Sequence, residues 1–338
     1  MDPLRIVEAA YRWESSEDAW LDGVVAAATP FAVGGGVVAC LVQCSPAPQV
    51  LAHAAEGTSA ENVDAIVRVC NAVDPAIAPT FFAPTEFVGN AAWRLERLAR
   101  AVSRPTTELT QGVPLPPVWA LIGGAPHEAA LVLVFPSVNG VAPDVPFPGD
   151  HSHMLGMVAA HLGAALRLRS LAPPARTDDE ETEAVLSPDG KVLHATGDAV
   201  ELRSSLTEAV LRSERARSHL RKVDATEATE LWSALVEGKW SVLEATERDG
   251  KRFLLARKNT LRPPTLPAEP AARRDLIDLT KEESDVVWLA VQGHSHKYIA
   301  YELGLSAPTV ARRLRAAMDK LRVGSRRELL RKLGVPDA

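Results

Sequence analysis

The chain has 338 residues, of which 46% are hydrophobic and 24% are charged, as is ordinary for a soluble globular protein of two or three domains. The formal net charge of −6 is unevenly spread, because residues 279–338 hold 11 Lys and Arg against 7 Asp and Glu while the rest of the chain is acidic. No apolar run is long enough to cross a bilayer, and the acidic N-terminus lacks the basic and then apolar pattern of a signal peptide, so we expect a cytoplasmic protein without a membrane partner.

Residues 1–172 predict helices that flank a mainly antiparallel sheet. Apolar residues at helical spacing indicate the helices, and short apolar runs bounded by turn residues indicate the strands. Residues 3–29 are rich in helix formers and suggest a partly buried helical surface. The expected helices that follow are 60–72, 91–102 and 151–170, and the expected strands are 34–43, 118–122 and 129–135. The last two strands form a hairpin in a sheet that is covered on both faces.

This pattern resembles a GAF-type sensor domain that spans residues 1–172 and is closed by a long helix of sequence AAHLGAALRLRSL. The resemblance implies a small-molecule or regulatory pocket between the sheet and the helices. No residue can be assigned to such a pocket from the sequence.

Two features of this region could be mistaken for cofactor or redox sites. The glycines at 34–36 lack the Gly-Lys-Ser/Thr that follows in a phosphate-binding loop, and we expect no cofactor. Cys40, Cys44 and Cys70 are an odd number of thiols in a cytosolic chain, which argues against a disulfide framework. Buried or incidental thiols are favoured, and a redox or metal role is the alternative.

Three histidines lie in or near the long helix. His151 and His153 would point from different helix faces, and apart from Asp150 no Cys, Asp or Glu converges on them or on His161. We therefore predict solvated histidines and no metal site.

Residues 182–259 predict a second, smaller unit built from hairpins and helices. Ser-Pro-Asp-Gly and Arg-Asp-Gly each separate two short strands, as in a tight hairpin. The expected strands are 183–186, 191–194, 240–246 and 252–257, and the expected helices are about 199–221 and 225–237. The arrangement resembles a PAS-like fold, and a dimerisation segment is the alternative.

The first helix of this unit carries basic residues interleaved with glutamates. A solvated helix face or a helical dimer contact explains this pattern better than a nucleic-acid-binding stripe. The basic residues are Arg203, Arg212, Arg215, Arg217, Arg221 and Lys222. Residues 260–278 then form a proline-rich linker.

Residues 279–334 carry four short helical patterns, each preceded by a residue able to cap a helix. Thr280 with Glu283, and Ser325 with Glu328, have the spacing of capping boxes, in which a hydroxyl and a carboxylate satisfy backbone N–H groups at a helix start. These pairs mark the starts of the first and fourth helices.

The second and third helices have serine caps. Ser295 can cap the second and Ser306 the third, where Pro308 is tolerated in the first turn. The turns between the helices are so short that the helices must fold sharply on one another, as in a helix-turn-helix.

The third helix has a buried stripe and a basic face. With Val310 as reference, the apolar side chains fall within about 80° of it, whereas Arg312, Arg315 and Asp319 fall near the opposite side. The apolar side chains are Leu314, Ala317, Met318 and Leu321. Arg313 flanks the stripe. A basic face on the second helix of a helix-turn-helix suits the major groove of DNA.

Together these residues resemble the LuxR-type (GerE-like) helix-turn-helix domain of bacterial transcription factors. The matching residues are Leu279, Thr280, Glu283, Val286, Gly293, Ser295, Lys297, Ile299, Ala300, Leu303, Ser306, Thr309, Val310, Lys320, Leu321, Val323 and Arg326. The sequence departs from the family pattern at Glu282, His296, Tyr298 and Arg313, and Tyr298 removes a capping carboxylate from the second helix.

The expected fold class is therefore a multidomain α+β protein, with a GAF-like sensor, a PAS-like segment and an all-α, four-helix C-terminal domain. The resemblance implies a regulator that binds double-stranded DNA as a homodimer, responds to a small-molecule or protein effector and acts with RNA polymerase. The expected DNA-binding residues are Lys297, Ser306, Thr309, Arg312, Arg313, Arg315 and Arg326.

Two alternatives remain open, and catalysis is disfavoured. The helix-turn-helix also resembles region four of a sigma factor, and a degenerate helix-turn-helix could serve as a protein-interaction adaptor. No Gly-x-Ser-x-Gly nucleophile elbow is present, and the acidic clusters TDDEE and KEESD are explained by solvation and by a helix start. We therefore expect that the protein is not an enzyme.

Overall fold

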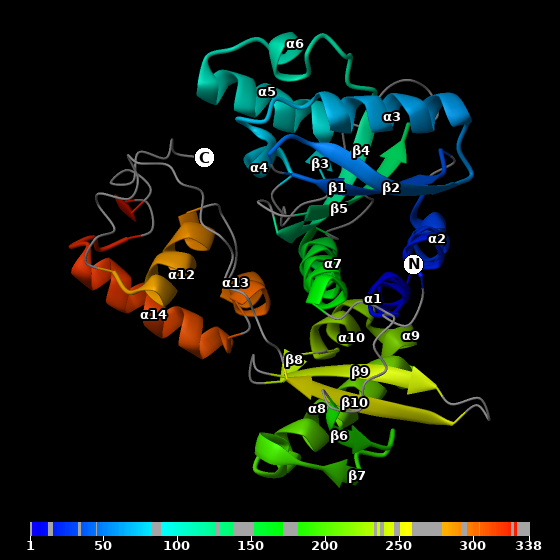
Figure 1. Cartoon of the computed structure of the whole chain (residues 1–338), viewed down its shortest axis with the longest axis vertical. Helices are drawn as coiled ribbons and strands as arrows, with labels where there is room; N and C mark the ends of the chain where they lie inside the picture. The colour runs from blue at the N-terminus through cyan, green and yellow to red at the C-terminus, as the bar shows by residue number, and fades with distance from the viewer. Residues whose placement is uncertain are drawn as a thin grey trace.

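The computed structural model contains two α+β units followed by a helical C-terminal unit (Figure 1). The described residues are 2–12, 16–32, 35–44, 46–82, 89–125, 129–137, 152–171, 182–232, 235–236, 240–246, 251–258, 279–291, 296–303, 305–325 and 328–329. The expected linker at 260–278 lies outside them. None of the described helices is long and apolar enough to cross a membrane.

The first unit is built on a five-stranded antiparallel sheet with the strand order β2-β1-β5-β4-β3. Its strands are β1 (Val37–Gln43), β2 (Gln49–Glu56), β3 (Gly89–Asn90), β4 (Val118–Ala125) and β5 (Ala129–Pro136). Its main helices are α1 (Leu4–Ala10), α2 (Glu17–Ala28), α3 (Ala60–Ala72), α4 (Ala78–Phe81), α5 (Ala91–Val102), α6 (Thr106–Leu109) and α7 (Ser152–Leu171). The predicted hairpin of β4 and β5 is confirmed.

Side-chain caps explain why several of these helices begin where they do. Ser16 accepts a hydrogen bond from the Ala19 N–H at the start of α2, and Ser59 accepts one from the Asn62 N–H at the start of α3. The Asn90 side chain accepts from two backbone N–H groups of α5. Each cap satisfies N–H groups that the first helical turn leaves without a partner.

Helices cover both faces of the first sheet, as the apolar strands predict. One face packs against α1, α2 and α7 in a core that includes Trp20, Leu133 and Leu162. The other face packs against α3, α4 and α5 around Phe82. Side chains on both faces of β1 and β5 are buried, and this explains why the two strands are continuous apolar runs in the sequence.

Helix α7 approaches strand β4 closely at glycines. A Cβ on Gly163 would lie 2.8 Å from the backbone nitrogen of Gly124, and a Cβ on Gly123 would lie 2.6 Å from the carbonyl oxygen of Ala159. Such distances exclude any larger residue unless the backbone moves. The close approach therefore depends on glycine at Gly123 and Gly163.

The second unit is a smaller sheet with the order β7-β6-β10-β9-β8. Its strands are β6 (Thr182–Leu186), β7 (Val192–Ala195), β8 (Leu235–Val236), β9 (Trp240–Thr246) and β10 (Arg252–Lys258). Both predicted hairpins, β6 with β7 and β9 with β10, are confirmed as antiparallel pairs. Counted within each unit, the two sheets have the same strand order: second, first, fifth, fourth, third.

The helices of the second unit differ in part from the prediction. They are α8 (Arg203–Arg215), the π-helical segment η4 (Ala216–Leu220), α9 (Arg221–Val223) and α10 (Ala225–Leu231). The helix predicted over 225–237 is wrong at its end, because α10 stops at Leu231 and Leu235–Val236 form strand β8. Trp232, which follows the last residue of α10, has an extended backbone and ends the helix.

The two units share an apolar joint that buries a histidine predicted to be solvated. His161 of α7 is fully buried, with Nδ1 3.4 Å from the Tyr11 hydroxyl. Its ring packs edge-on against both Tyr11 and Trp232, at centroid distances of 6.0 and 5.3 Å. The prediction of a solvated side chain is wrong at this position, because α1 and α10 cover this face of α7. His151 lies outside the described residues, as does the side chain of His153.

The three cysteines are buried, and the described chain has no disulfide at them. Burial raises the pKa of the Cys44 thiol to about 12. A hydrogen bond with Cys40 and burial together raise the pKa of Cys70. These environments favour protonated, unreactive thiols.

Candidate nucleic-acid interface

The C-terminal unit has a core of its own. Its described helices are α12 (Lys281–Val291), α13 (His296–Leu303) and α14 (Ala307–Lys320). The buried residues belong only to this unit and include Val286, Ile299, Leu314 and Leu329. In Figure 1, α13 lies beside α7, and α14 runs along the outer side of the unit.

The predicted capping box at the start of α12 is confirmed. The Thr280 N–H donates to Glu283 Oε2 at 2.8 Å, and the Glu283 N–H donates to Thr280 Oγ1 at 3.3 Å. The same Glu283 oxygen accepts from Lys320 Nζ at 2.7 Å. These two donors, Lys320 first, hold the pKa of Glu283 below its ordinary value. Glu283 therefore fixes both its own helix and the end of α14.

The predicted cap of α14 is confirmed as well. Ser306 accepts a hydrogen bond from the Thr309 N–H at 3.2 Å, and Pro308 occupies the first turn. The hydroxyls of Ser306 and Thr309 also lie 2.8 Å apart. Both hydroxyls are thereby held at the N-terminus of the helix, where backbone N–H groups and the helix dipole favour an anion.

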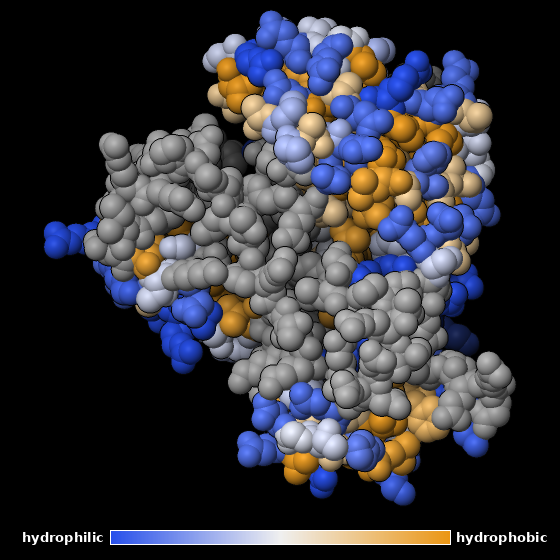
Figure 2. Space-filling model, in the orientation of Figure 1, coloured by the Kyte–Doolittle hydropathy of each residue, from blue (hydrophilic) through white to orange (hydrophobic). Residues whose placement is uncertain are grey.

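The faces of α14 follow the predicted pattern. Val310, Leu314, Ala317 and Leu321 are buried, and Met318 packs against the same core. Arg312, Arg315 and Asp319 are exposed on the opposite face, and Arg313 is intermediate. Figure 2 shows hydrophilic residues along the outer edge of this unit, where α14 runs in Figure 1.

The start of the fourth helix is only partly described. The Glu328 N–H donates to Ser325 Oγ at 3.2 Å, as the capping box predicts. The Glu328 carboxylate, however, accepts from the Gly324 N–H at 2.7 Å rather than from the predicted Ser325 N–H. The carboxylate reaches one residue further back, and the helix itself lies mostly outside the described residues.

Three of the predicted residues cannot be placed as side chains. Arg326 and Ser295 lie outside the described residues. Lys297 lies in the first turn of α13, but its side chain is outside the description. The structure thus brings Ser306, Thr309, Arg312, Arg313 and Arg315 together on one helix.

Sequence reasoning missed the role of Lys320, which we named only among the residues that match the LuxR-type pattern. Its partner Glu283 is 37 positions away in the sequence, and local spacing does not indicate such a pair. Lys320 is therefore engaged within the domain, whereas the described contacts of Arg312 and Arg315 include no ion pair.

Within the described ranges, no group of three or more His, Cys, Asp or Glu residues could hold a metal ion. No curated protein and no solved structure matches the chain significantly. Residues 278–333 match the family model GerE, described as bacterial regulatory proteins, luxR family, so the C-terminal unit is a LuxR-family domain.

Proposed function

We propose that this protein is a sequence-specific DNA-binding transcriptional regulator and that α14 is its recognition helix. The observation that carries the proposal is the outward face of α14, where Arg312 and Arg315 are exposed opposite the buried stripe of a LuxR-family domain. The major groove admits one helix, and arginine pairs bidentately with guanine O6 and N7.

Each residue of the interface has a role in this proposal. Arg312 and Arg315 face base edges and supply sequence choice, while Arg313 and Arg326 contact the phosphate backbone. At the N-termini of α14 and α13, Thr309 and Lys297 hold phosphates. Ser306 orients the Thr309 hydroxyl, from which it lies 2.8 Å.

The two N-terminal units complete the proposal as a sensor. They carry the acidic excess of the chain, which DNA would repel, and they fold around cores separate from that of the C-terminal unit. In this proposal they are GAF-like and PAS-like domains that detect a small-molecule or protein effector and gate DNA binding. The active form is a homodimer, since paired half-sites multiply specificity, and it acts with RNA polymerase in the cytoplasm without catalytic chemistry of its own.

Selection of bound fragments from genomic DNA by the purified full-length protein tests this function. We expect a shared, two-fold symmetric sequence among the fragments, with affinity that falls as salt is raised. A complete lack of binding at low salt, across several independent fragment pools, would favour the adaptor alternative. Promoter-specific transcription with core polymerase alone would favour the sigma-factor alternative.

A further inference from the structure

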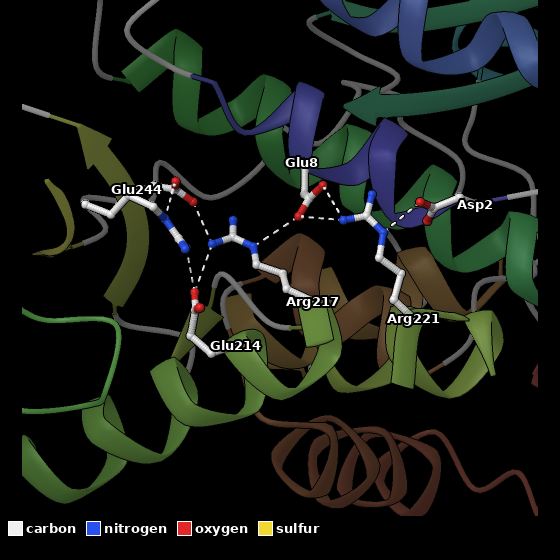
Figure 3. Close-up of polar contacts among 7 residues, drawn as sticks. Asp2, Glu8, Glu214, Arg217, Arg221 and Glu244 are labelled. Carbon is white, nitrogen blue, oxygen red and sulfur yellow. Dashed lines mark hydrogen bonds and ion pairs between the residues drawn. The ribbon is translucent and has the colours of Figure 1, made fainter. Parts of the chain in front are cut away.

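A network of ion pairs joins the N-terminal segment to the second unit, although its partners are far apart in the sequence (Figure 3). Four carboxylates and three guanidinium groups take part. They are Asp2, Glu8, Glu214, Arg217, Arg221, Glu244 and Arg252. The first two belong to the N-terminal segment, and the other five belong to the second unit.

Glu8 of α1 lies at the centre of the joint. Its carboxylate accepts from Arg217 Nε at 3.1 Å and from Arg221 Nη1 at 3.2 Å. Arg221 Nε also donates to Asp2 Oδ2 at 2.6 Å. One helix of the first unit therefore binds two arginines, one within the π-helical segment η4 and one directly after it.

The network continues into the sheet of the second unit. Arg217 Nη1 lies 2.6 Å from Glu244 Oε2 of β9 and 3.1 Å from Glu214 Oε1 of α8. Arg252 of β10 pairs with the same two carboxylates, at 2.7 Å to Glu214 and 2.8 Å to Glu244. Arg252 is the first residue of β10, which is the last described strand before the C-terminal unit.

The segment held by Glu8 is not a regular helix. Between Arg217 and Arg221, Ser218 has φ −79° and ψ −147°, and its hydroxyl donates to the Arg215 carbonyl at 2.7 Å. A π-helical turn with a non-helical residue is a local irregularity of a kind often found where a helix changes conformation or binds. The ion pairs hold this irregular segment from outside, and buried Ala216 holds it from the core.

The ion pairs at the centre of the network are buried enough from water to contribute to the stability of the joint. The side chains of Arg217 and Glu8 are 17% and 23% exposed, so water screens them less than it screens a surface pair. Removing one partner would leave another charge half-buried without compensation. The seven side chains should thus open together rather than one at a time.

From this geometry we infer that the network is a conformational latch. Through Glu8, helix α1 of the first unit binds segment 216–223 of the second unit. When the Glu8 charge is lost, this segment opens locally while both sheets stay folded. The latch is a switching element of the sensor region, and its existence requires no assumption about DNA binding.

Hydrogen exchange of the full-length Glu8→Gln variant tests the latch. The substitution keeps the shape of the side chain and removes its charge. We expect amides of 216–223 to exchange on the order of tenfold faster, because the Glu8 carboxylate accepts charge-assisted hydrogen bonds from two arginines and the substitution weakens both. Amides of β1 should exchange as in the wild type.

Glu108→Gln is the matched control, because Glu108 pairs with Arg104 within the first unit and lies outside the joint. This variant should leave the amide exchange of residues 216–223 unchanged. Unchanged exchange of these residues in Glu8→Gln, or equal acceleration of β1 and of 216–223, would overturn the latch.

A double-mutant cycle with Arg221→Gln separates a lost contact from general damage. If Glu8 and Arg221 act through each other, the double variant should exchange about as fast as either single variant over 216–223. If the rate increases of the two single variants multiply in the double variant, the two residues act independently and the inference is wrong.

Discussion

Lys320 Nζ, at the last turn of the proposed recognition helix, lies 2.7 Å from Glu283 Oε2, at the first turn of α12. The carboxylate also accepts from the Thr280 N–H, so one side chain caps α12 and fixes the far end of α14. The direction in which α14 presents its arginines therefore depends on a residue that contacts no DNA in our proposal.

We predict that Glu283→Gln weakens the C-terminal unit by about 1–2 kcal/mol, because the pair with Lys320 is lost and the cap is weakened. Hydrogen exchange of α12 and α14 in the full-length protein measures this change. The difference from wild type should also depend on pH. The pKa of Glu283 is lowered in the folded state, so its stabilising effect is present above the ordinary value of 4.5 and is lost as pH falls through the folded pKa. A difference that persists in acid would contradict this assignment.

Replacing Arg312 or Arg315 with alanine should relax sequence choice and cost on the order of 1–3 kcal/mol of specific binding. Quantitative footprinting on a selected site and on a mutated site measures both effects. Arg215→Ala, which removes a 67% exposed arginine from the second unit, is the matched control and should change neither. Identical footprints for all three variants would remove this face of α14 from the DNA surface.

Replacing Lys297 with alanine should act differently. A phosphate contact carries no sequence information, so the variant should bind all sequences more weakly by a similar factor. The slope of log affinity against log salt should fall by about 1. Binding titrations at several salt concentrations test this, and a selective loss of one base preference would instead make Lys297 a base-reading residue.

Gly163→Ala should destabilise the first unit by roughly 1–3 kcal/mol, because its Cβ would meet the backbone of β4 and no flexible side chain can move aside. Gly23→Ala in α2 is the control, since no atom lies within 4 Å of its added Cβ. It should stabilise the protein by about 0.5–1 kcal/mol. Chemical denaturation of both variants measures these changes. A Gly163→Ala variant as stable as the wild type would mean that the helix can shift away from the sheet.

The cysteines should be inert in the folded protein. The pKa of Cys44 is raised to about 12 and that of Cys70 is also raised, so neither thiol forms much of the reactive thiolate. We expect alkylation at mildly alkaline pH to modify none of the three cysteines without denaturant and all of them with it, as measured by intact mass. Rapid native modification of any one would favour the redox alternative.

Local signals in the sequence predict many elements well. The bounds predicted for α3 and α5 agree with the structure because Ser59 and Asn90 cap them. The stripe and the charged face of α14 follow from helical spacing alone. In such cases each residue interacts with neighbours three or four positions away, and a local pattern contains the relevant information.

Other features depend on contacts that no local pattern reveals. β2 is mostly exposed and rich in alanine, so it lacks the apolar alternation of a typical strand. His161 is buried by α1 and α10, which are distant in sequence. Arg217 and Arg221, predicted on a solvated or dimeric helix face, instead pair with Asp2 and Glu8 more than 200 positions away. The identical strand order of the two sheets likewise emerges only from the pairing.

The glycine contact between α7 and β4 has a mechanical consequence. Because the two backbones approach so closely there, little space is left to absorb a displacement. A movement of the sheet must therefore move α7 with it, and α7 carries His161 into the joint with the second unit. We therefore expect a displacement of β4 to be passed to α7 at Gly123, Gly124 and Gly163, and along α7 to the joint.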